Sequence, residues 1–134
     1  MPFDYDDDLT RKTYTMTFTV DPDKWKEVVG DDVVEDQDIK ADAGKPKLRF
    51  VPWEIVNDIA YVREYGVKKY HAVDSWKEVE PGRYIDALLR HTLAFAQDPA
   101  GDDEESGMPH LWHIACNVAF LCEYLKVGKL DDLQ

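Results

Sequence analysis

The sequence contains little cysteine and no long apolar run. Its two cysteines, Cys116 and Cys122, are six residues apart on one expected helix, so they cannot meet in a disulfide, and no CxxC pair suggests a metal site. We expect both to be reduced thiols of the core. The chain also lacks an apolar stretch long enough to cross a bilayer and a signal-peptide pattern, so we expect a soluble, cytoplasmic protein.

Basic residues are scarce relative to acidic ones. The 134 residues include 16 Lys and Arg against 28 Asp and Glu, a formal net charge of −12, and residues 1–44 alone carry 13 acidic and 5 basic side chains. A nucleic-acid backbone would repel such a chain, so direct nucleic-acid binding is not expected. A small anionic ligand is compatible with this charge where local basic groups or a metal ion offset it. Alternatively, the acidic segment could imitate nucleic acid toward a basic partner.

Residues 1–44 are interpreted as a small acidic appendage. Apolar residues alternate with threonines at Thr13–Val20, which predicts a half-buried strand. A short helix should follow, capped by Asp21 and ending at Gly30. The rest of the segment is a charged connector, which could form a second short strand near Val33.

Residues 45–130 carry the periodicity of helices. Three segments, beginning at Pro52, Pro81 and Pro109, place apolar residues three and four apart, as helices with one inward face do. The expected inward residues of the first two are Ile55, Val56, Ile59 and Val62, and then Tyr84, Leu88, His91 and Phe95. The sequence therefore predicts a mainly α fold, a thin bundle of three long helices with a small N-terminal β-strand and short-helix appendage.

The stretch Glu105–Tyr124 is apolar enough to be buried, yet it carries polar residues on one stripe. At 100° per residue, His110, His113 and Asn117 share a narrow face of the predicted helix. An imidazole or amide without a partner is costly in an apolar setting, so the stripe needs partner side chains, a metal ion or a ligand. His91, on the apolar stripe of the preceding helix, is either a core histidine or a further member of such a site.

The loop before this helix is acidic. Pro109 suits the first helical position, and Ser106 or Glu105 could accept hydrogen bonds from the amides of the first turn. Four consecutive acids are ordinarily a solvated linker. However, Asp103 and Glu105 could also reach a metal ion shared with His110. Histidine with carboxylate suits a transition metal, whereas carboxylate with water suits magnesium.

A second polar stripe runs along the helix predicted from Pro52. It could be a solvated face with ordinary pairing four residues apart. Alternatively, Glu54 and Asp58 could hold a divalent cation through oxygen ligands, since magnesium needs only one or two protein carboxylates. Lys68 and Lys69 would then meet phosphates. The full stripe is Glu54, Asp58, Tyr61, Tyr65, Lys68 and Lys69.

Further candidates lie around the helix predicted from Pro81. Trp76, in the loop before it, could stack on a base or cover the end of the core. On the helix itself, Arg83 and Arg90 lie on one side together with Asp86. An ordinary surface ion pair explains Asp86 and Arg90, which are four residues apart, as well as a binding role does.

Four blocks occur in order along residues 44–126: GKPKLRFVPWEIV, YGVKKY, GRYIDALLRH and DDEESGMPHLWHIACNVAFL. In this order and spacing they resemble the phage-associated dATP/dGTP diphosphohydrolases, the MazZ-like proteins. The resemblance implies hydrolysis of purine deoxynucleoside triphosphates between the α and β phosphates, giving monophosphate and pyrophosphate. It also implies a role in phage nucleotide metabolism, and hence in the cytoplasm of a bacterial host.

The chain is similar, more distantly, to the MazG-like all-α nucleotide pyrophosphohydrolases. Those enzymes hold magnesium with a paired glutamate motif and a Glu-x-x-Asp motif, whereas the segment His110–His113 stands in the place of the second motif here. Either histidines bind a different metal, such as Mn²⁺, Co²⁺ or Zn²⁺, or Mg²⁺ is held by Glu54, Asp58, Asp103 and Glu105. The relatives dimerise to complete their bundles, which implies a homodimer or larger homo-oligomer with sites near the interface.

These residue types suit that reaction, in which a divalent metal and basic side chains offset the triphosphate charge while a base deprotonates water. The candidate catalytic groups are Glu54, Glu105, His110 and His113. The candidate substrate contacts are Tyr65, Lys68, Lys69, Trp76, Arg83, Arg90 and Asn117, with Trp112 as a further platform for a purine. The candidate metal ligands are Glu54, Asp58, His91, Asp103, Glu105, His110 and His113.

Two other functions compete with the enzyme. The same pocket could bind and sequester a nucleotide without turnover. Alternatively, the acidic segment 1–44 could bind and inhibit a basic host factor, with the histidine stripe serving only as a buried hydrogen-bond network.

Overall fold

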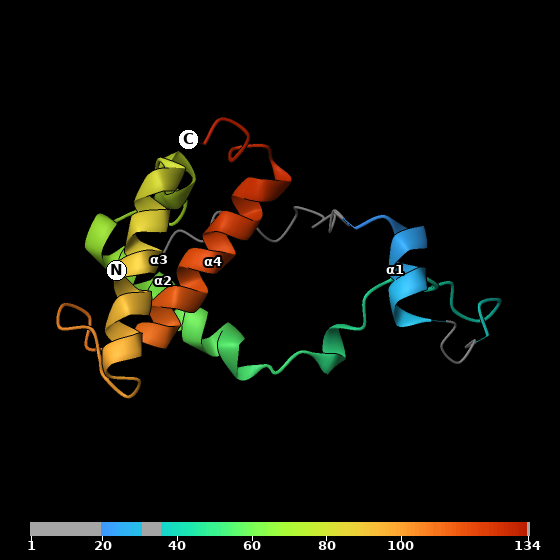
Figure 1. Ribbon diagram of the computed structural model, residues 1–134, viewed down its shortest axis with the longest axis horizontal. Helices are drawn as coiled ribbons and strands as arrows, with labels where there is room; N and C mark the ends of the chain where they lie inside the picture. Colours follow the sequence, from blue (N-terminus) through green and yellow to red (C-terminus); the bar gives the residue numbers. More distant parts are fainter. Residues whose placement is uncertain (1–19, 31–35, 134) are drawn as a thin grey trace. The chain divides into compact units, whose positions relative to one another are not determined.

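The computed structural model describes residues 20–30 and 36–133, and the regular secondary structure of these residues is helical (Figure 1). The helices are α1 (Pro22–Val29), η1 (Leu48–Phe50), α2 (Glu54–Tyr70), η2 (Ser75–Glu78), α3 (Pro81–Gln97) and α4 (His110–Lys126). The prediction of a mainly α protein is therefore confirmed. The strands expected at Thr13–Val20 and near Val33 lie outside the described residues, apart from Val20, which is part of a bend.

The chain divides into two compact units, Met1–Pro46 and Lys47–Gln134. Helix α1 belongs to the first unit and has both of the ends that its sequence predicts. The carboxylate of Asp21 accepts a hydrogen bond from the backbone N–H of Asp23 at 2.9 Å, and Gly30 ends the helix with φ of 75°. A carboxylate satisfies a free amide of the first turn, and glycine adopts positive φ at little steric cost.

The second unit consists mainly of α2, α3 and α4, with α4 as the central helix. It packs along α3 and also against α2. Pro81 is the first residue of α3, as predicted. Helix α2 starts at Glu54, two residues later than predicted, and continues through Gly66 to Tyr70, where His71 in the left-handed region ends it. Among the described residues no helix combines the length and apolar character needed to cross a membrane.

The start of α4 differs from its prediction. Pro109 is the N-cap residue rather than the first helical residue, and no side chain caps the helix. The Ser106 hydroxyl instead accepts from the backbone N–H of Met108 at 3.2 Å and lies 2.6 Å from Nε2 of His113. The Glu105 carboxylate accepts hydrogen bonds from side chains of α2. Both groups expected to cap α4 therefore tie the preceding loop to other parts of the unit.

An aromatic cluster closes the end of the bundle nearest η2. Trp76 stacks on Phe120 and Tyr124, with ring centroids 5.0 and 6.1 Å away, and Tyr84 stacks on Phe120 at 4.7 Å. The Tyr84 hydroxyl donates to the Trp76 carbonyl at 2.6 Å, and the Tyr124 hydroxyl shares its one proton between the Trp76 carbonyl at 2.6 Å and the Val79 carbonyl at 2.7 Å. Of the two roles that the sequence left open for Trp76, covering the core is therefore observed.

Two expectations about burial were wrong. Cys116 is buried, but Cys122 is exposed, because it lies about 120° around α4 from Cys116 at 100° per residue. On α2, Val62 is buried, whereas Ile55 and Val56 on the first turn are exposed, since only the later turns of the helix reach buried positions.

Candidate functional site

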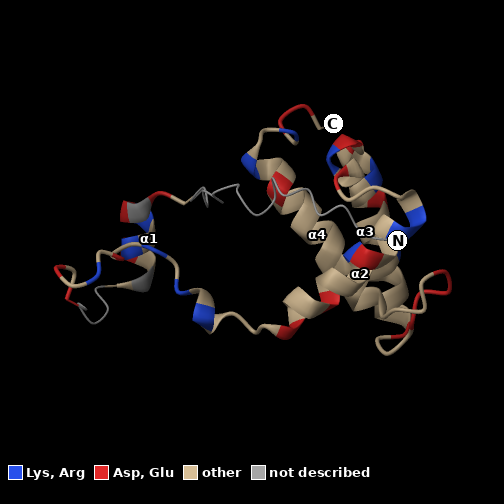
Figure 2. Cartoon of the chain, turned by 180° about the vertical axis from the view of Figure 1, so that it is seen from behind, with Lys and Arg blue, Asp and Glu red and all other residues tan. Residues whose placement is uncertain are grey.

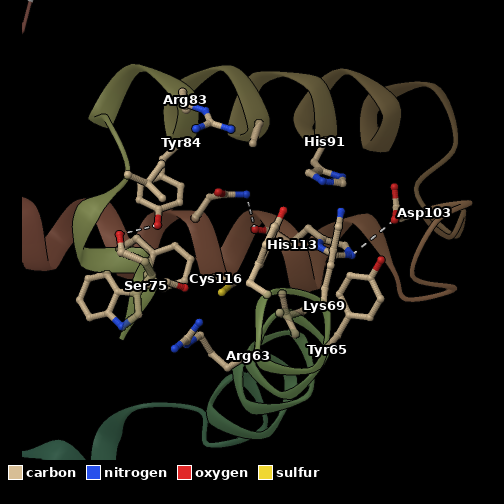
Figure 3. Close-up of a pocket in the computed structure, with 18 of the residues that line it drawn as sticks. Arg63, Tyr65, Lys69, Ser75, Arg83, Tyr84, His91, Asp103, His113 and Cys116 are labelled. Carbon is tan, nitrogen blue, oxygen red and sulfur yellow. Dashed lines mark hydrogen bonds and ion pairs between the residues drawn. The ribbon is translucent and has the colours of Figure 1, made fainter. Parts of the chain in front are cut away.

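A cavity of about 770 Å³ lies among α2, α3, α4 and η2. Its wall combines basic, acidic, imidazole and aromatic side chains, and Figure 3 shows that several of them point into the same space. The cavity brings together most of the residues that the sequence singled out: Tyr65, Lys69, Trp76, Arg83, Arg90, His91, Asp103, Glu105, His113 and Asn117.

Four residues of the polar stripe on α2 lie outside this wall: Glu54, Asp58, Tyr61 and Lys68. Glu54 and Asp58 are eleven and seven residues before Tyr65, which places them about 16 and 10 Å away along the helix axis at 1.5 Å per residue. Lys68 is exposed and lies about 100° around the helix from Lys69, which does line the cavity. The stripe predicted on α2 is therefore divided between the cavity and the outer surface.

Three histidines meet where α3 packs on the start of α4. The Nδ1 atoms of His91 and His110 are 3.0 Å apart, and the rings of His91 and His113 stack with centroids 4.5 Å apart and planes 6° from parallel. His110 itself is outside the cavity wall but contacts His91, which is part of it. Helical spacing explains the cluster, because His110 and His113 are one turn apart on α4 and His91 lies on the inward stripe of α3 with Tyr84.

Burial favours the neutral form of two of these imidazoles. It lowers the pKa of His91 below its ordinary value, and His113 and His110 nearby act in the same direction, while Asp103 opposes them. Burial likewise lowers the pKa of His113, again against the effect of Asp103. The lowered pKa favours the form of each ring that has one N–H donor and one lone pair, and such a lone pair can accept a proton or bind a metal ion.

The loop between α3 and α4 holds Asp103 in place beside the histidines. The backbone of Asp103 is paired twice, because its N–H donates to the carbonyl of Met108 at 2.8 Å and its carbonyl accepts from Gly107 at 2.7 Å. Its carboxylate accepts from the backbone N–H of Ser106 at 2.9 Å. Burial by itself would raise the pKa of Asp103, but the hydrogen bonds from Ser106 and the nearby His113 lower it below its ordinary value. The loop thus presents an ionised carboxylate to the cavity.

His91, Asp103 and His110 form a group that could hold one metal ion. One ligand atom from each lies within 4.8 Å of the others. The 3.0 Å between the two Nδ1 atoms fits nitrogen ligands of a shared ion, because each metal–nitrogen bond is about 2.0–2.1 Å long. Two imidazoles and a carboxylate are a donor set typical of first-row transition metals rather than of magnesium.

Ser106, His113 and Asp103 do not form a nucleophile triad. The Ser106 hydroxyl lies 2.6 Å from Nε2 of His113, and the Asp103 carboxylate lies 3.8 Å from the same nitrogen. In a serine hydrolase the carboxylate binds the other ring nitrogen, which turns the first one toward the serine. The site role of Ser106 was missed from the sequence, although its place three residues after Asp103 is typical of a side-chain-to-backbone turn.

Glu105 joins the loop to α2. One oxygen of its carboxylate accepts a hydrogen bond from the Tyr65 hydroxyl at 3.0 Å and also an ion-paired hydrogen bond from the Lys69 ammonium. The bond from Lys69, followed by that from Tyr65, lowers the pKa of Glu105, and the same carboxylate raises the pKa of Lys69. Burial and the bond to Glu105 raise the pKa of Tyr65. All three groups therefore hold their ordinary neutral-pH charges in one connected cluster.

Arg63 is a cavity residue that sequence reasoning missed. Its guanidinium lies 5.2 Å from the centre of the Phe120 ring and donates to the Val73 carbonyl at 2.5 Å, which ties α2 to the segment before η2. The available signal was helical spacing, since Arg63 precedes Gly66 by three residues and Tyr70 by seven on one face of α2. A cation is therefore present at the aromatic end of the cavity as well.

The remaining candidates divide between cavity and surface. Asn117 is buried, and its side-chain amide donates to the carbonyl of His113 at 2.8 Å, one turn earlier on α4. Burial raises the pKa of the Cys116 thiol to about 11, so this cavity residue is a protonated thiol rather than a nucleophile. Trp112 stacks on Tyr61 at 5.5 Å and is not part of the wall.

Comparisons with known proteins agree with the resemblance seen in the sequence. The family described as dATP/dGTP diphosphohydrolase, N-terminal, matches residues 35–134. A dATP/dGTP diphosphohydrolase of Salmonella phage PMBT28 is 31% identical over 94 residues, which cover 70% of this chain and 32% of that protein. The chain thus spans about a third of the length of the curated relative that it matches, and no solved structure matches it. The chain belongs to the dATP/dGTP diphosphohydrolase N-terminal domain family.

Proposed function

We propose that the cavity binds a purine deoxynucleoside triphosphate, dATP or dGTP, and that the protein hydrolyses it to the monophosphate and pyrophosphate with the help of a divalent metal ion. Family membership and the name of the phage relative support this substrate class. The observation that carries the proposal is that basic side chains line the same cavity as His91 and Asp103, which together with His110 form a histidine–carboxylate group of metal-binding spacing.

The basic side chains offset the negative charge of the substrate. Lys69 comes from α2, Arg83 and Arg90 come from α3, seven residues or about two turns apart, and all three line the cavity. A triphosphate is a polyanion, and a protein of net charge −12 repels it unless cations are gathered locally. Arginine suits this task because its planar guanidinium can bind two phosphate oxygens at once.

His91, His110 and Asp103 would hold the metal ion. When bound, a divalent ion would offset charge on the phosphates and lower the pKa of a water molecule. The chain contributes the His91 imidazole, whose pKa burial lowers, the His110 imidazole beside it, and a carboxylate that the loop keeps ionised. Nitrogen donors favour manganese, cobalt or zinc over magnesium in such a group.

His113 is our candidate for the group that takes a proton from the attacking water. It lines the cavity, burial lowers its pKa, and its Nε2 lies 3.8 Å from the Asp103 carboxylate, which would stabilise the imidazolium formed. Glu105 is less suited because the bonds from Lys69 and Tyr65 lower the pKa of its carboxylate, which makes it a weaker base. Hydrolysis by water needs no covalent nucleophile, which agrees with the protonated state of Cys116.

A product assay tests this function against its two rivals. The protein is incubated with dATP or dGTP together with magnesium, manganese or cobalt, and monophosphate and pyrophosphate are followed. Formation of both products supports the enzyme. Binding without products would instead support nucleotide sequestration, and the absence of both would refute the nucleotide function. Deletion of residues 1–20 tests the inhibitor alternative, because an enzyme should retain its hydrolysis rate without this N-terminal part of the acidic segment.

We further propose that a second copy of this chain covers the outer face of α4. Leu111, Val118 and Leu125 repeat every seven residues on this helix, and 48%, 42% and 60% of their surfaces are exposed. Glu123 and Lys126 are the only Asp, Glu, Lys or Arg residues of helix α4, which is therefore almost entirely tan in Figure 2. A sparsely charged helix with an apolar seven-residue repeat is typical of a buried helix, and a two-fold pairing would make this face complementary to itself.

Sedimentation tests the second copy. We expect Val118→Asp to shift the protein toward the monomer mass while preserving helical circular dichroism. Gln97→Asp introduces the same charge at the exposed last residue of α3 and should leave the mass unchanged. A parent chain that sediments as a monomer at all concentrations would refute this pairing.

A further inference from the structure

The Glu105 carboxylate occupies a site at which two donors of α2 converge. The Tyr65 hydroxyl and the Lys69 ammonium are four residues apart, hence one helical turn, and both bind the same carboxylate oxygen. Tyr65, Lys69 and Glu105 all line the cavity that also contains His91 and Asp103, and Figure 3 shows Tyr65 and Lys69 reaching from α2 toward these residues.

We propose that Tyr65 and Lys69 form a subsite for a phosphate group, and that Glu105 closes this subsite in the nucleotide-free protein. The polyphosphate of the ligand displaces the Glu105 side chain and takes over both donors. This inference rests on the proposed function, because it assigns one part of the same cavity. It narrows the role of Tyr65 from a general substrate contact to a hydrogen-bond donor to phosphate, and it changes the role of Glu105 from a catalytic group or metal ligand to an internal competitor.

The chemistry of the two donors suits a phosphate oxygen. A carboxylate oxygen and a phosphate oxygen are both anionic acceptors, and each can take a hydroxyl donor and an ammonium donor at once. The observed geometry is therefore that of an anion bound by the subsite, with the anion supplied by the chain itself. Glu105 is also absent from the metal-binding group of His91, Asp103 and His110, so its carboxylate remains available for this second role.

Displacement of Glu105 is inexpensive. Its side chain is 61% exposed, so the ion pair with Lys69 is a surface pair, a class that contributes little to stability. The rest of the loop need not move, since Asp103, two residues earlier, is held by its own hydrogen bonds to Ser106 and Met108. A polyphosphate carries several negative charges against the single charge of Glu105 and so binds the same ammonium more strongly.

Binding of inorganic tripolyphosphate to the full chain in metal-depleted buffer tests the subsite. Glu105→Gln removes the competing charge, so we expect its Kd for tripolyphosphate to fall about two- to fivefold, as follows from the modest strength of an exposed ion pair. Glu104→Gln removes the same charge from the neighbouring residue, which does not line the cavity, and should leave the Kd within about 1.5-fold of the parent value. Deoxyadenosine, which lacks phosphate, should bind both variants as it binds the parent.

A double-variant cycle separates direct competition from a general charge effect. In a Lys69→Gln background, Glu105→Gln should tighten tripolyphosphate binding clearly less, because the contested ammonium is gone and only the neutral Tyr65 hydroxyl remains. Equal tightening in both backgrounds, or a Kd that is unchanged or weaker in Glu105→Gln, would overturn the proposal. Failure of tripolyphosphate to bind both the parent and Glu105→Gln would overturn it as well.

The outcome for this subsite is distinguishable from that for the enzyme. Hydrolysis of dATP or dGTP without the expected Glu105→Gln shift keeps the proposed function and rejects the subsite. Conversely, the shift in tripolyphosphate binding can be observed even if no nucleotide is hydrolysed. In that case the phosphate subsite stands while the hydrolytic function fails.

Discussion

We expect Tyr124→Phe to destabilise the helical unit more than Tyr84→Phe does. Tyr124 is 1% exposed, and its single hydroxyl proton is shared between the carbonyls of Trp76 and Val79, at 2.6 and 2.7 Å. The Tyr84 hydroxyl donates only to the Trp76 carbonyl, also at 2.6 Å. Phenylalanine keeps each ring and its stacking on Phe120 or Trp76, so the substitutions remove hydrogen bonds with little change in packing.

The magnitudes follow from which carbonyl loses its donor. A hydrogen bond between neutral groups contributes about 0.5–1.5 kcal/mol net, whereas a buried acceptor left without a partner costs about 1–3 kcal/mol. After Tyr84→Phe, the Trp76 carbonyl still accepts from Tyr124, so we expect a loss of about 0.5–1.5 kcal/mol. After Tyr124→Phe, the Val79 carbonyl loses its side-chain donor, so we expect about 1–3 kcal/mol.

The double variant, Tyr84→Phe with Tyr124→Phe, gives the most specific expected loss of stability. It leaves the Trp76 carbonyl only the longer backbone bond from Val79 N–H at 3.4 Å. Its loss of stability should therefore exceed the sum of the two single losses by about 0.5–1 kcal/mol, because each tyrosine compensates for the absence of the other.

Urea unfolding followed by helical circular dichroism measures these losses. All variants are compared at one protein concentration, because self-association would add to apparent stability. Tyr61→Phe is the matched control, since Tyr61 is exposed and retains its stacking on Trp112, and its effect should lie within about 0.5 kcal/mol of zero. Equal losses for Tyr84→Phe and Tyr124→Phe, or a strictly additive double variant, would refute the assignment of these hydroxyls as the bonds that hold η2 on the bundle.

Three further expectations concern the cavity. His110→Ala should abolish turnover and lower the amount of bound metal while most helicity remains, whereas Glu54→Ala should keep both metal and turnover. If His110→Ala unfolds and its folded fraction binds as much metal as the parent, the role of this histidine is structural. Lys69→Ala should weaken binding of the triphosphate at least threefold more than binding of the monophosphate, and equal losses would show that it contacts neither the β nor the γ phosphate. At pH 8 a thiol reagent should modify the exposed Cys122 quickly and the buried Cys116 only in denaturant. Burial raises the pKa of Cys116 to about 11, so roughly one Cys116 side chain in a thousand is a thiolate at this pH. Rapid modification of both thiols in the native protein would contradict this.

Local features were predictable because they depend on a few neighbouring residues. The ends of α1 are defined by Asp21, which precedes Pro22, and by Gly30. The start of α3 is defined by Pro81. Regular spacing of apolar residues defined the three long helices, and the same spacing placed His110, His113 and Asn117 on one face of α4. Capping of α4 was not predictable in the same way, because the Ser106 hydroxyl contacts the side chain of His113 on α4 rather than the free amides of its first turn.

The predicted metal ligands show where helical spacing stops being informative. Glu54 and Asp58 share a face of α2 with Tyr65, but they lie about two to three turns away along the axis, beyond the part of the helix that borders the cavity. Asp103, in a loop without helical periodicity, is the carboxylate that meets His91 and His110. The prediction failed for Glu54 and Asp58 because periodicity specifies the angle of a residue around its helix, but not which part of a neighbouring helix or loop that residue faces.

The helices, the polar stripe of α4 and the family could be predicted from the sequence, since these follow from caps, periodicity and ordered motifs within one chain segment. The packing of the helices was needed to show that Asp103 joins His91 and His110, and that Glu105 binds Tyr65 and Lys69. It was also needed to show that Trp76 covers the core. These pairings depend on how α2 and α3 cross α4 and on the path of the loops between them, and each was one of several that local rules allowed.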